Sequence, residues 1–451
     1  MEKCGYRNKR IIFNLLSTLI ILTHCSFDSK SGIWKNKDSQ SVKKNVDRFK
    51  DFEKLYAETE TFNSIVKPSS TIKILLDPNK RSSSWTDEYY QSTNNPANFR
   101  YSDLNNLVFK SKKLSKFEIK KKFLYDNGDI IISDIKGNII VYSLEKESII
   151  YKYNFYKKKF KKINKDINFI IEDGVLFVTD NLGYFYALDY KNEKLLWARN
   201  FKIPFRSNLK LQDKIIIASN QDNTINILNK FTGETLRSIP TEKMVLKNDF
   251  KNSLAILRNN IFFLNTYGSL YSIEPNKLKI KWFINLNQSL ELVSDNLFYS
   301  NPILGHKENV VISTDPYLYI LNANSGATIK KIPITSIFQP LISGNNLFLI
   351  TKDNLLVCIK LDNGKILYSL DIAQKIAEHV NSKKKTIFIN SFSVINDQLF
   401  VFLKNSYLVK FTKIGRTSEI IKLPTKLNSQ PIFIEEKILF INNKNNLVII
   451  D

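Results

Sequence analysis

Cysteine and histidine are scarce in this chain of 451 residues, with three of each. Two of the cysteines, Cys4 and Cys25, lie near the N-terminus, so Cys358 is the one thiol of the main body and an intrachain disulfide framework is excluded there. Cys358 lies in an apolar stretch and is expected to be a buried, inert thiol. The few histidines, His24, His306 and His379, provide neither a metal cluster nor a His-dependent catalytic triad.

Acidic residues are also few relative to basic ones: 43 Asp and Glu stand against 67 Lys and Arg, a net charge of +24. Such an excess favours nucleic acid as a partner only where it is clustered. Lys, Asn and Ile are common throughout, and the lysine runs at 157–162 and 383–385 fall between expected strand pairs, as solvated loops do. Nucleic-acid binding is therefore not expected. Gly-rich phosphate loops are absent as well, and nothing indicates a cofactor or a metal.

The first 25 residues have the pattern of an export signal. Basic residues precede the apolar run 11–22, which is too short for a resident transmembrane helix. Leu22-Thr23-His24-Cys25 resembles the lipobox of bacterial lipoproteins, although His24 departs from the small residue usual there. Cys25 is the expected lipidation site, and Ser26 after it favours the outer membrane of a Gram-negative bacterium. Ordinary signal cleavage and an uncleaved anchor are the alternatives.

The rest of the chain divides into a polar tether, residues 26–66, and one large domain, residues 67–451. The hydrophobic content of 43%, with 31 Phe and 20 Tyr, suits a buried core built from strands. Residues 72–76 are expected to form a first strand.

A repeat dominates the domain, and its clearest copy spans residues 173–200. There the apolar strand 174–180 leads through a turn at Gly183 into a second strand, 184–189, and then a third that contains Trp197. The first-turn residue recurs about every 44 residues, a period typical of four-stranded propeller blades. Gly and Asn suit these turns because they tolerate positive φ. The markers are Gly137, Gly183, Asn223, Gly268, Tyr317, Asn354, Ser406 and Asn446.

A second turn follows the second strand of most copies, as at Gly233 and Gly326, and the segments between copies provide a fourth strand. The last copy stops at Asp451 without its outer strand. The stretch 107–110 can supply it, which would avoid open sheet edges. The prediction is an all-β protein: an eight-bladed β-propeller of four-stranded antiparallel blades, closed by an N-terminal strand in the last blade.

At this point the chain resembles the PQQ-like repeat propellers, and among them the BamB family of outer-membrane assembly lipoproteins. The resemblance rests on the Gly-x-x-Tyr-Ala-Leu-Asp…Trp pattern from Gly183 to Trp197, its echo from Gly268 to Trp282, and the pair Asn94-Asn95 in the leading segment. Trp197 and Trp282 are expected to pack between blades.

The resemblance implies a non-catalytic, lipid-anchored scaffold of the β-barrel assembly (BAM) complex. Such a scaffold lies on the periplasmic side of the outer membrane and binds the POTRA domains of BamA, together with other BAM components. By the same resemblance Phe205 and Arg206 match a partner-binding element, with Arg206 as a charge-assisted donor and Phe205 as an apolar anchor. Asp295 lies close to where an acidic element would fall.

Two alternatives remain open. One is a periplasmic quinoprotein dehydrogenase, which would hold pyrroloquinoline quinone and Ca²⁺ on the propeller axis; the chain lacks the adjacent Cys-Cys pair common beside that cofactor and is short for those enzymes. The other is a propeller that binds an unrelated periplasmic ligand.

Overall fold

The computed structural model describes residues 26–27, 34–35, 61–156, 158–243, 250–287 and 298–451. The chain divides into two compact units, Met1–Glu58 and Thr59–Asp451. In the first, the short strands β1 (Ser26–Phe27) and β2 (Trp34–Lys35) pair antiparallel. The predicted signal segment and Cys25 lie outside the described residues. In the second unit, ordered contacts begin before residue 67, since Phe62 N donates to Pro333 O at 2.7 Å.

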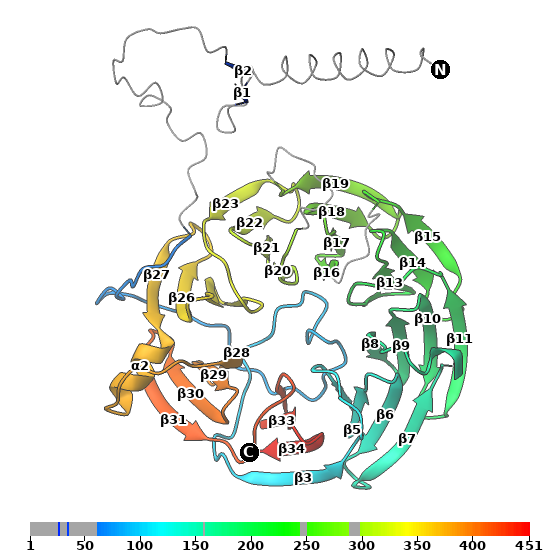
Figure 1. The fold of residues 1–451 in the computed structure, drawn as a ribbon, viewed down its shortest axis with the longest axis horizontal. Helices are drawn as coiled ribbons and strands as arrows, with labels where there is room; N and C mark the ends of the chain where they lie inside the picture. Colours follow the sequence, from blue (N-terminus) through cyan, green and yellow to red (C-terminus); the bar gives the residue numbers. More distant parts are fainter. Residues whose placement is uncertain (1–25, 28–33, 36–60, 157, 244–249, 288–297) are drawn as a thin grey trace, which may run out of the picture. The chain divides into compact units, whose positions relative to one another are not determined.

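Eight four-stranded antiparallel sheets form the second unit, arranged as the blades of a ring (Figure 1). In seven of them the four strands follow one another in sequence, from the centre of the ring outward. Blades 1 to 4 consist of β4 (Leu124–Asp126), β5 (Asp129–Ser133), β6 (Asn138–Ser143) and β7 (Ser148–Asn154); β8 (Ile167–Glu172), β9 (Val175–Asp180), β10 (Tyr184–Asp189) and β11 (Lys194–Asn200); β12 (Lys210–Gln212), β13 (Ile215–Ser219), β14 (Ile225–Asn229) and β15 (Thr235–Ile239); and β16 (Ser253–Leu257), β17 (Asn260–Leu264), β18 (Ser269–Glu274) and β19 (Lys279–Asn285).

Blades 5 to 7 repeat this order, and blade 8 combines both ends of the propeller. They consist of β20 (Leu304–His306), β21 (Asn309–Ser313), β22 (Leu318–Asn322) and β23 (Thr328–Ile332); β24 (Leu341–Ser343), β25 (Asn346–Ile350), β26 (Leu355–Lys360) and β27 (Ile366–Asp371); β28 (Ile389–Ile395), β29 (Gln398–Leu403), β30 (Tyr407–Thr412) and β31 (Thr417–Lys422); and β32 (Ile432–Ile434), β33 (Lys437–Ile441), β34 (Asn446–Ile450) and β3 (Leu107–Lys113).

The N-terminal strand β3 closes the ring. It pairs antiparallel with β34, with Leu107 opposite Ile450 and Lys113 opposite Asn446. The backbone N–H and C=O groups along the outer edge of β34 therefore have partners in β3 and are not left as an open sheet edge. The prediction of an eight-bladed, all-β propeller is confirmed, and so is the origin of its last strand.

The turn between the second and third strands of a blade is formed by side-chain hydrogen bonds to the backbone and by a residue with a positive φ. In blade 2 the Asp180 carboxylate accepts hydrogen bonds from the backbone N–H groups of Leu182 (2.8 Å) and Tyr184 (2.9 Å), while Gly183 has a φ of +87°. A side chain at Gly183 would also collide with the Ile203 backbone, 2.8 Å from the position of a Cβ. In blade 8 the positive φ falls on Asn445, one residue before the predicted marker.

Neighbouring blades interlock through the second-turn glycines. Trp197 in β11 is buried, and its indole N–H donates to Lys230 O at 2.9 Å. Its ring lies against Gly233 of blade 3, and Trp282 lies against Gly326 of blade 5 in the same way. The predicted packing role of both tryptophans is confirmed. Cys358 is fully buried, as predicted, and burial raises the pKa of its thiol.

Two local features differ from expectation. Residues 72–76 belong to no sheet: the chain there is held by blade 6, whose Asn346 amide donates to Leu75 O at 2.8 Å.

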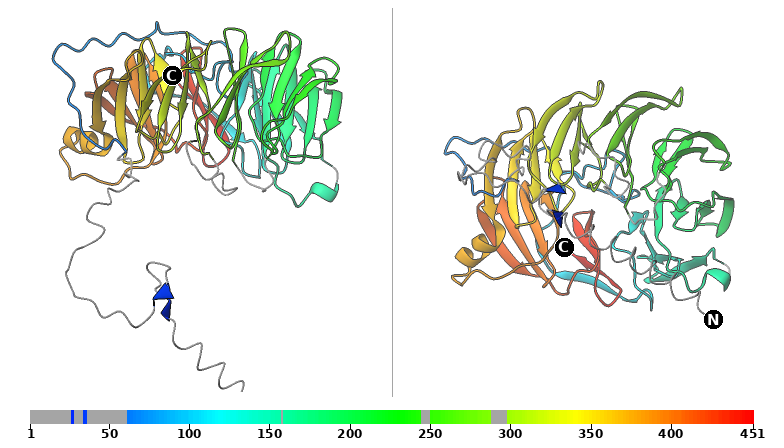
Figure 2. Two further views of the ribbon diagram at one scale, coloured as in Figure 1. Left: turned by 90° about the horizontal axis from the view of Figure 1, so that it is seen from above. Right: turned by 45° about the horizontal axis from the view of Figure 1, so that its top comes forward.

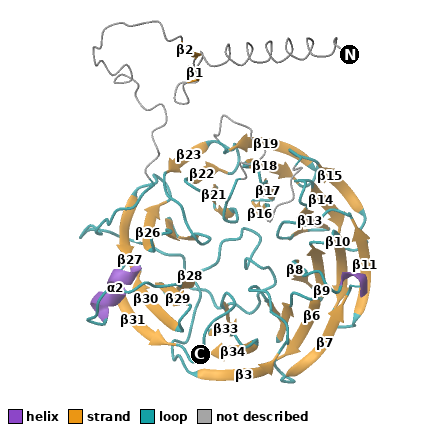
Figure 3. Ribbon diagram, viewed as in Figure 1, coloured by secondary structure: helices purple, strands orange, loops and turns teal. Residues whose placement is uncertain are grey.

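Blades 6 and 7 are joined by the helix α2 (Ile372–His379), which lies outside the ring of strands (Figure 3). Its N-cap Asp371 accepts a hydrogen bond from Gln374 N at 3.0 Å. A short 3-10 helix, η2 (Lys158–Phe160), follows blade 1. Helices long and apolar enough to span a membrane are not found among the described residues.

Residues 82–99, here called the axial segment, lie in the centre of the ring (Figures 1 and 2). They reach the inner part of every blade, mostly through backbone hydrogen bonds or Asn side chains. Asn94 alone bridges two blades, because its amide donates to both Leu254 O and Ile303 O at 2.8 Å. The blade residues that hydrogen-bond to the axial segment are, in blades 1 to 8 respectively, Tyr125, Ile171, Lys210, Ile256, Gly305, Ile342, Val394 and Glu435.

Candidate functional site

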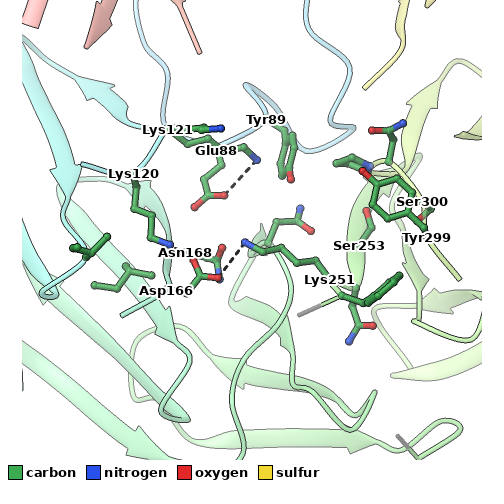
Figure 4. Close-up of a pocket in the computed structure, with 18 of the residues that line it drawn as sticks. Glu88, Tyr89, Lys120, Lys121, Asp166, Asn168, Lys251, Ser253, Tyr299 and Ser300 are labelled. Carbon is green, nitrogen blue, oxygen red and sulfur yellow. Dashed lines mark hydrogen bonds and ion pairs between the residues drawn. The ribbon is translucent and has the colours of Figure 1, made fainter. Parts of the chain in front are cut away.

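A pocket of about 980 Å³ lies between the axial segment and the segments that lead into the first strands of blades 1 to 5 (Figure 4). Its inner wall is made by Glu88 and Tyr89 of the axial segment. Segments that connect strands, such as those leading into the blades, lie on the surface of a fold and tolerate variation, so binding residues are commonly found on them. The outer walls are formed by residues 118–122, 166–168, 208, 250–253 and 298–302.

Asp166, which lines this pocket, lies close to three cationic side chains, each from a different blade. Lys120 Nζ is hydrogen-bonded to its carboxylate, Lys251 Nζ lies 3.3 Å from Oδ2, and Arg206 Nη1 lies 3.9 Å from the same oxygen. Burial alone would raise the pKa of Asp166, but Lys251 and Lys120 outweigh that effect and hold it below its usual range. The carboxylate therefore stays ionised, and the cluster as a whole carries excess positive charge.

A second charged pair lies beside the first. Lys122 Nζ is 3.6 Å from Glu88 Oε2 and 3.0 Å from the centre of the Tyr89 ring, a cation–π contact. Burial lowers the pKa of Lys122, although Glu88 and Asp87 partly offset this by attraction. Burial also raises the pKa of Tyr89, so its hydroxyl stays neutral.

The opposite side of the pocket is aromatic (Figure 4). The rings of Phe250 and Tyr299 meet edge to face, with their centroids 6.3 Å apart. Tyr299 is 57% exposed, so its ring is open to a ligand in the pocket. The pocket thus has one wall suited to anions and one suited to apolar groups.

Of the residues predicted to bind a partner, Arg206 pairs with Asp166, which lines this pocket, whereas Phe205 is buried. Phe205 is 1% exposed and packs edge to face on Phe185 and Phe201, with centroids 5.4 Å and 5.3 Å away. In this structure it supports the Arg206 loop from inside the blade interface, which corrects the expectation of an exposed anchor. Asp295 and Cys25 lie outside the described residues.

Sequence reasoning missed Asp166, Lys251 and Tyr299. They are far apart in the chain, and the repeat does not preserve their type because the lead-in segments vary from blade to blade. One signal was present: each of them lies shortly before the first strand of a blade. Residues at that position share one face of a propeller, so charged side chains there can converge.

The residues in the centre of the ring do not fit a quinone cofactor. Pyrroloquinoline quinone and its Ca²⁺ would need the axis of the propeller, and the axial segment lies there with hydrogen bonds to the surrounding blades. The Ca²⁺ ion would also need several oxygen ligands, mostly carboxylates and carbonyls, gathered at one place. Within the described ranges, no group of three or more His, Cys, Asp and Glu side chains could hold a metal ion.

Comparison with known sequences identifies a related family. Residues 157–370, a little under half of the chain, match the family model described as outer membrane protein assembly factor BamB. An uncharacterized protein of Rickettsia prowazekii is 25% identical over 256 residues, covering 54% of this chain and 60% of the relative. An uncharacterized protein of Buchnera aphidicola is 25% identical over 334 residues, covering 70% and 42%. The chain therefore spans less than two thirds of the length of these relatives.

Solved structures show the same fold at low identity. BamB from Moraxella catarrhalis has a TM-score of 0.59 and 12% identity, over 77% of this chain and 99% of that one. Quinohemoprotein alcohol dehydrogenase from Comamonas testosteroni scores 0.58 at 10% identity, over 82% and 81%. Similarity at this level establishes the propeller and leaves the activity open. Taken together, residues 157–370 of this chain are similar to the BamB family of PQQ-like repeat proteins, and the described domain has the β-propeller fold that BamB shares.

Proposed function

We propose that this chain is a non-catalytic scaffold of the β-barrel assembly complex, anchored by a lipid at Cys25 to the periplasmic face of the outer membrane. There it binds the POTRA domains of BamA and assists the folding and insertion of outer-membrane proteins. The observation that carries the proposal is the cluster of three cationic residues, Arg206, Lys120 and Lys251, around Asp166. Arg206 is the member of this cluster that the family resemblance assigns to partner binding.

The geometry of this cluster suits a protein partner. Arginine offers a planar set of donors to carboxylates and is enriched where interfaces concentrate their binding energy. Arg206 is held in place because its backbone N–H donates to Ser219 O at 3.0 Å and its carbonyl accepts from Asn252 N at 2.8 Å. A fixed backbone reduces the conformational entropy lost on binding.

The axial segment argues against the dehydrogenase alternative. An enzyme of that class would have to displace residues that hydrogen-bond to the blades, including the two-blade bridge made by Asn94. Titration of the purified chain with the quinone and Ca²⁺ should give a flat response. Stoichiometric uptake with dye-linked alcohol oxidation would replace the scaffold proposal.

The test of the scaffold is a crosslinked pull-down of the tagged, full-length chain from cell envelopes. Recovery of a POTRA-containing barrel protein supports the proposal, and its absence among the crosslinked proteins would refute it. A Cys25→Ser variant tests the anchor: it should leave the membrane fraction while the purified protein still captures isolated POTRA domains. A variant that stays in the membrane fraction would refute lipidation at Cys25.

A further inference from the structure

The pocket beside Asp166 has a property that a flat docking face would not need: its two walls differ in chemistry. The charged wall contains Lys120, Asp166 and Lys251, and the other wall contains Tyr299 (Figure 4). The ring of Phe250 lies against that of Tyr299, so this second wall is aromatic. The two walls meet at the segment before β16, which carries both Phe250 and Lys251, and they extend to Lys120 before β4 and to Tyr299 before β20. A ligand that uses both must carry an acidic group and an apolar group separated by a spacer.

The charge balance of the pocket favours an acidic ligand. Four cationic residues line it, and Arg206 reaches Asp166 beside them, whereas three anionic residues are present. The cationic lining residues are Lys120, Lys121, Lys122 and Lys251, and the anionic ones are Glu88, Glu118 and Asp166. Hydrogen bonds between an ammonium group and a carboxylate are among the strongest in proteins, more so where water is partly excluded.

Lys251 is the residue best placed to take a second carboxylate. Its side chain is 51% exposed, compared with 29% for Lys120 and 14% for Arg206. When Lys251 turns toward a ligand, Lys120 and Arg206 still neutralise Asp166. Of the three cations, Lys251 is therefore the one that can turn toward a ligand in the open part of the pocket.

We propose that this pocket binds a short acidic peptide segment, with a carboxylate on Lys251 and an aromatic or aliphatic side chain against Tyr299. The volume of about 980 Å³ lies at the upper end of the range for small-molecule pockets, larger than a lone small carboxylate would fill. The inference goes beyond the scaffold role, since it concerns the chemistry that the pocket recognises. It holds whichever protein carries the segment.

The test selects ligands from a displayed library of random peptides of about ten residues, using the immobilised full-length chain. Enriched peptides should contain Asp or Glu together with a Phe, Tyr, Trp or Leu. The best of them, labelled with a fluorophore, is then measured by fluorescence polarisation. Replacing its acidic residue by the matching amide should weaken binding about tenfold, the effect of one charge-assisted hydrogen bond.

Two variants of the protein locate the site. Lys251→Gln should remove the preference for the acidic peptide over its amide form, and Tyr299→Ala should weaken only peptides that carry the apolar residue. Lys194→Gln, on the outer strand β11, is the matched control and should bind normally; unchanged melting temperatures verify folding. Enrichment of basic peptides, or equal binding by all three variants, would overturn the proposal. Equal competition by free benzoate would also overturn it, because the ligand would then be a small carboxylate.

Discussion

Lys210 Nζ and Asp87 Oδ2 lie 2.6 Å apart in a pair that solvent scarcely reaches, with side chains 0% and 8% exposed. The same ammonium donates to Gln91 O at 3.0 Å. Burial lowers the pKa of Lys210, while Asp87 favours the charged form. This pair ties the axial segment to the first strand of blade 3, so the centre of the ring and the blades depend on each other.

Removing one partner of this pair should destabilise the propeller. In Asp87→Ala the ammonium of Lys210 would remain buried without its counter-charge, which typically costs about 3–5 kcal/mol. The midpoint of urea unfolding, followed by circular dichroism, should fall clearly. The double variant Asp87→Ala with Lys210→Met should recover part of the loss, because no charge is then buried. A single variant as stable as the parent would contradict this account.

The Trp197–Gly233 contact should be intolerant of even one added carbon. A Cβ at Gly233 would lie 2.4 Å from the Trp197 ring, and its φ of +67° adds backbone strain. Gly128→Ala provides the control, since Gly128 also has a positive φ, +86°, but nothing lies within 4 Å of its Cβ position. The control should lose about 1–2 kcal/mol from strain alone.

Gly233→Ala should lose more than this control, because Trp197 must leave the blade interface. Its fluorescence spectrum should shift to longer wavelength as the ring becomes exposed. Equal unfolding midpoints for the two alanine variants would show that the tryptophan contact contributes nothing.

Arg206→Glu should abolish capture of POTRA domains without lowering the melting temperature substantially. The substitution reverses a charge at the cation cluster, while Lys120 and Lys251 still neutralise Asp166. Arg237→Glu changes the same charge on the outer strand β15 and should bind normally. Surface plasmon resonance with immobilised POTRA domains distinguishes the two, and normal binding by Arg206→Glu would remove this residue from the interface.

Acidification should weaken the propeller partly through His306. Burial lowers the pKa of this imidazole below its usual value, although Asp77 and the Gly344 carbonyl, 2.9 Å from Nε2, partly offset this. The neutral form is therefore favoured in the folded state. Its contribution to stability is fully present above the unfolded pKa of about 6.5 and is lost as the pH falls below it.

Comparison of urea midpoints from about pH 7.5 to about pH 5.5 checks this sign. The decrease should be smaller in His306→Gln than in the parent. His379→Gln, at the exposed end of α2, should keep the parental pH dependence. Parallel curves for all three proteins would exclude His306 as a source of the acid sensitivity.

Features that depend on nearby residues were predictable. The turn at Gly183 requires a positive φ, and apolar strands on both sides of it follow from composition, so blade number and repeat length could be derived from the sequence. The closing strand was also predictable, because the last copy ends one strand short and exposed edges are avoided. Residues 72–76 were wrongly predicted as a strand because their apolar pattern is satisfied by packing on blade 6 instead.

The candidate site could be predicted only in part from the sequence. Arg206 could be named from the family pattern, but its neighbours Asp166, Lys120 and Lys251 come from blades separated by tens of residues. The burial of Phe205 was not predictable either, since an apolar residue in a loop can face the solvent or the core, and its aromatic neighbours decide which.

The amino-acid sequence by itself determined the propeller: its repeat, its eight blades and its closure all follow from turn chemistry and strand patterning, which act over a few residues. Only the tertiary structure decided what lies in the centre and on the face. The axial segment takes its course because scattered backbone groups in eight blades must all find hydrogen-bond partners. The pocket exists because lead-in segments remote in sequence meet around Asp166, and that proximity is set by ring geometry.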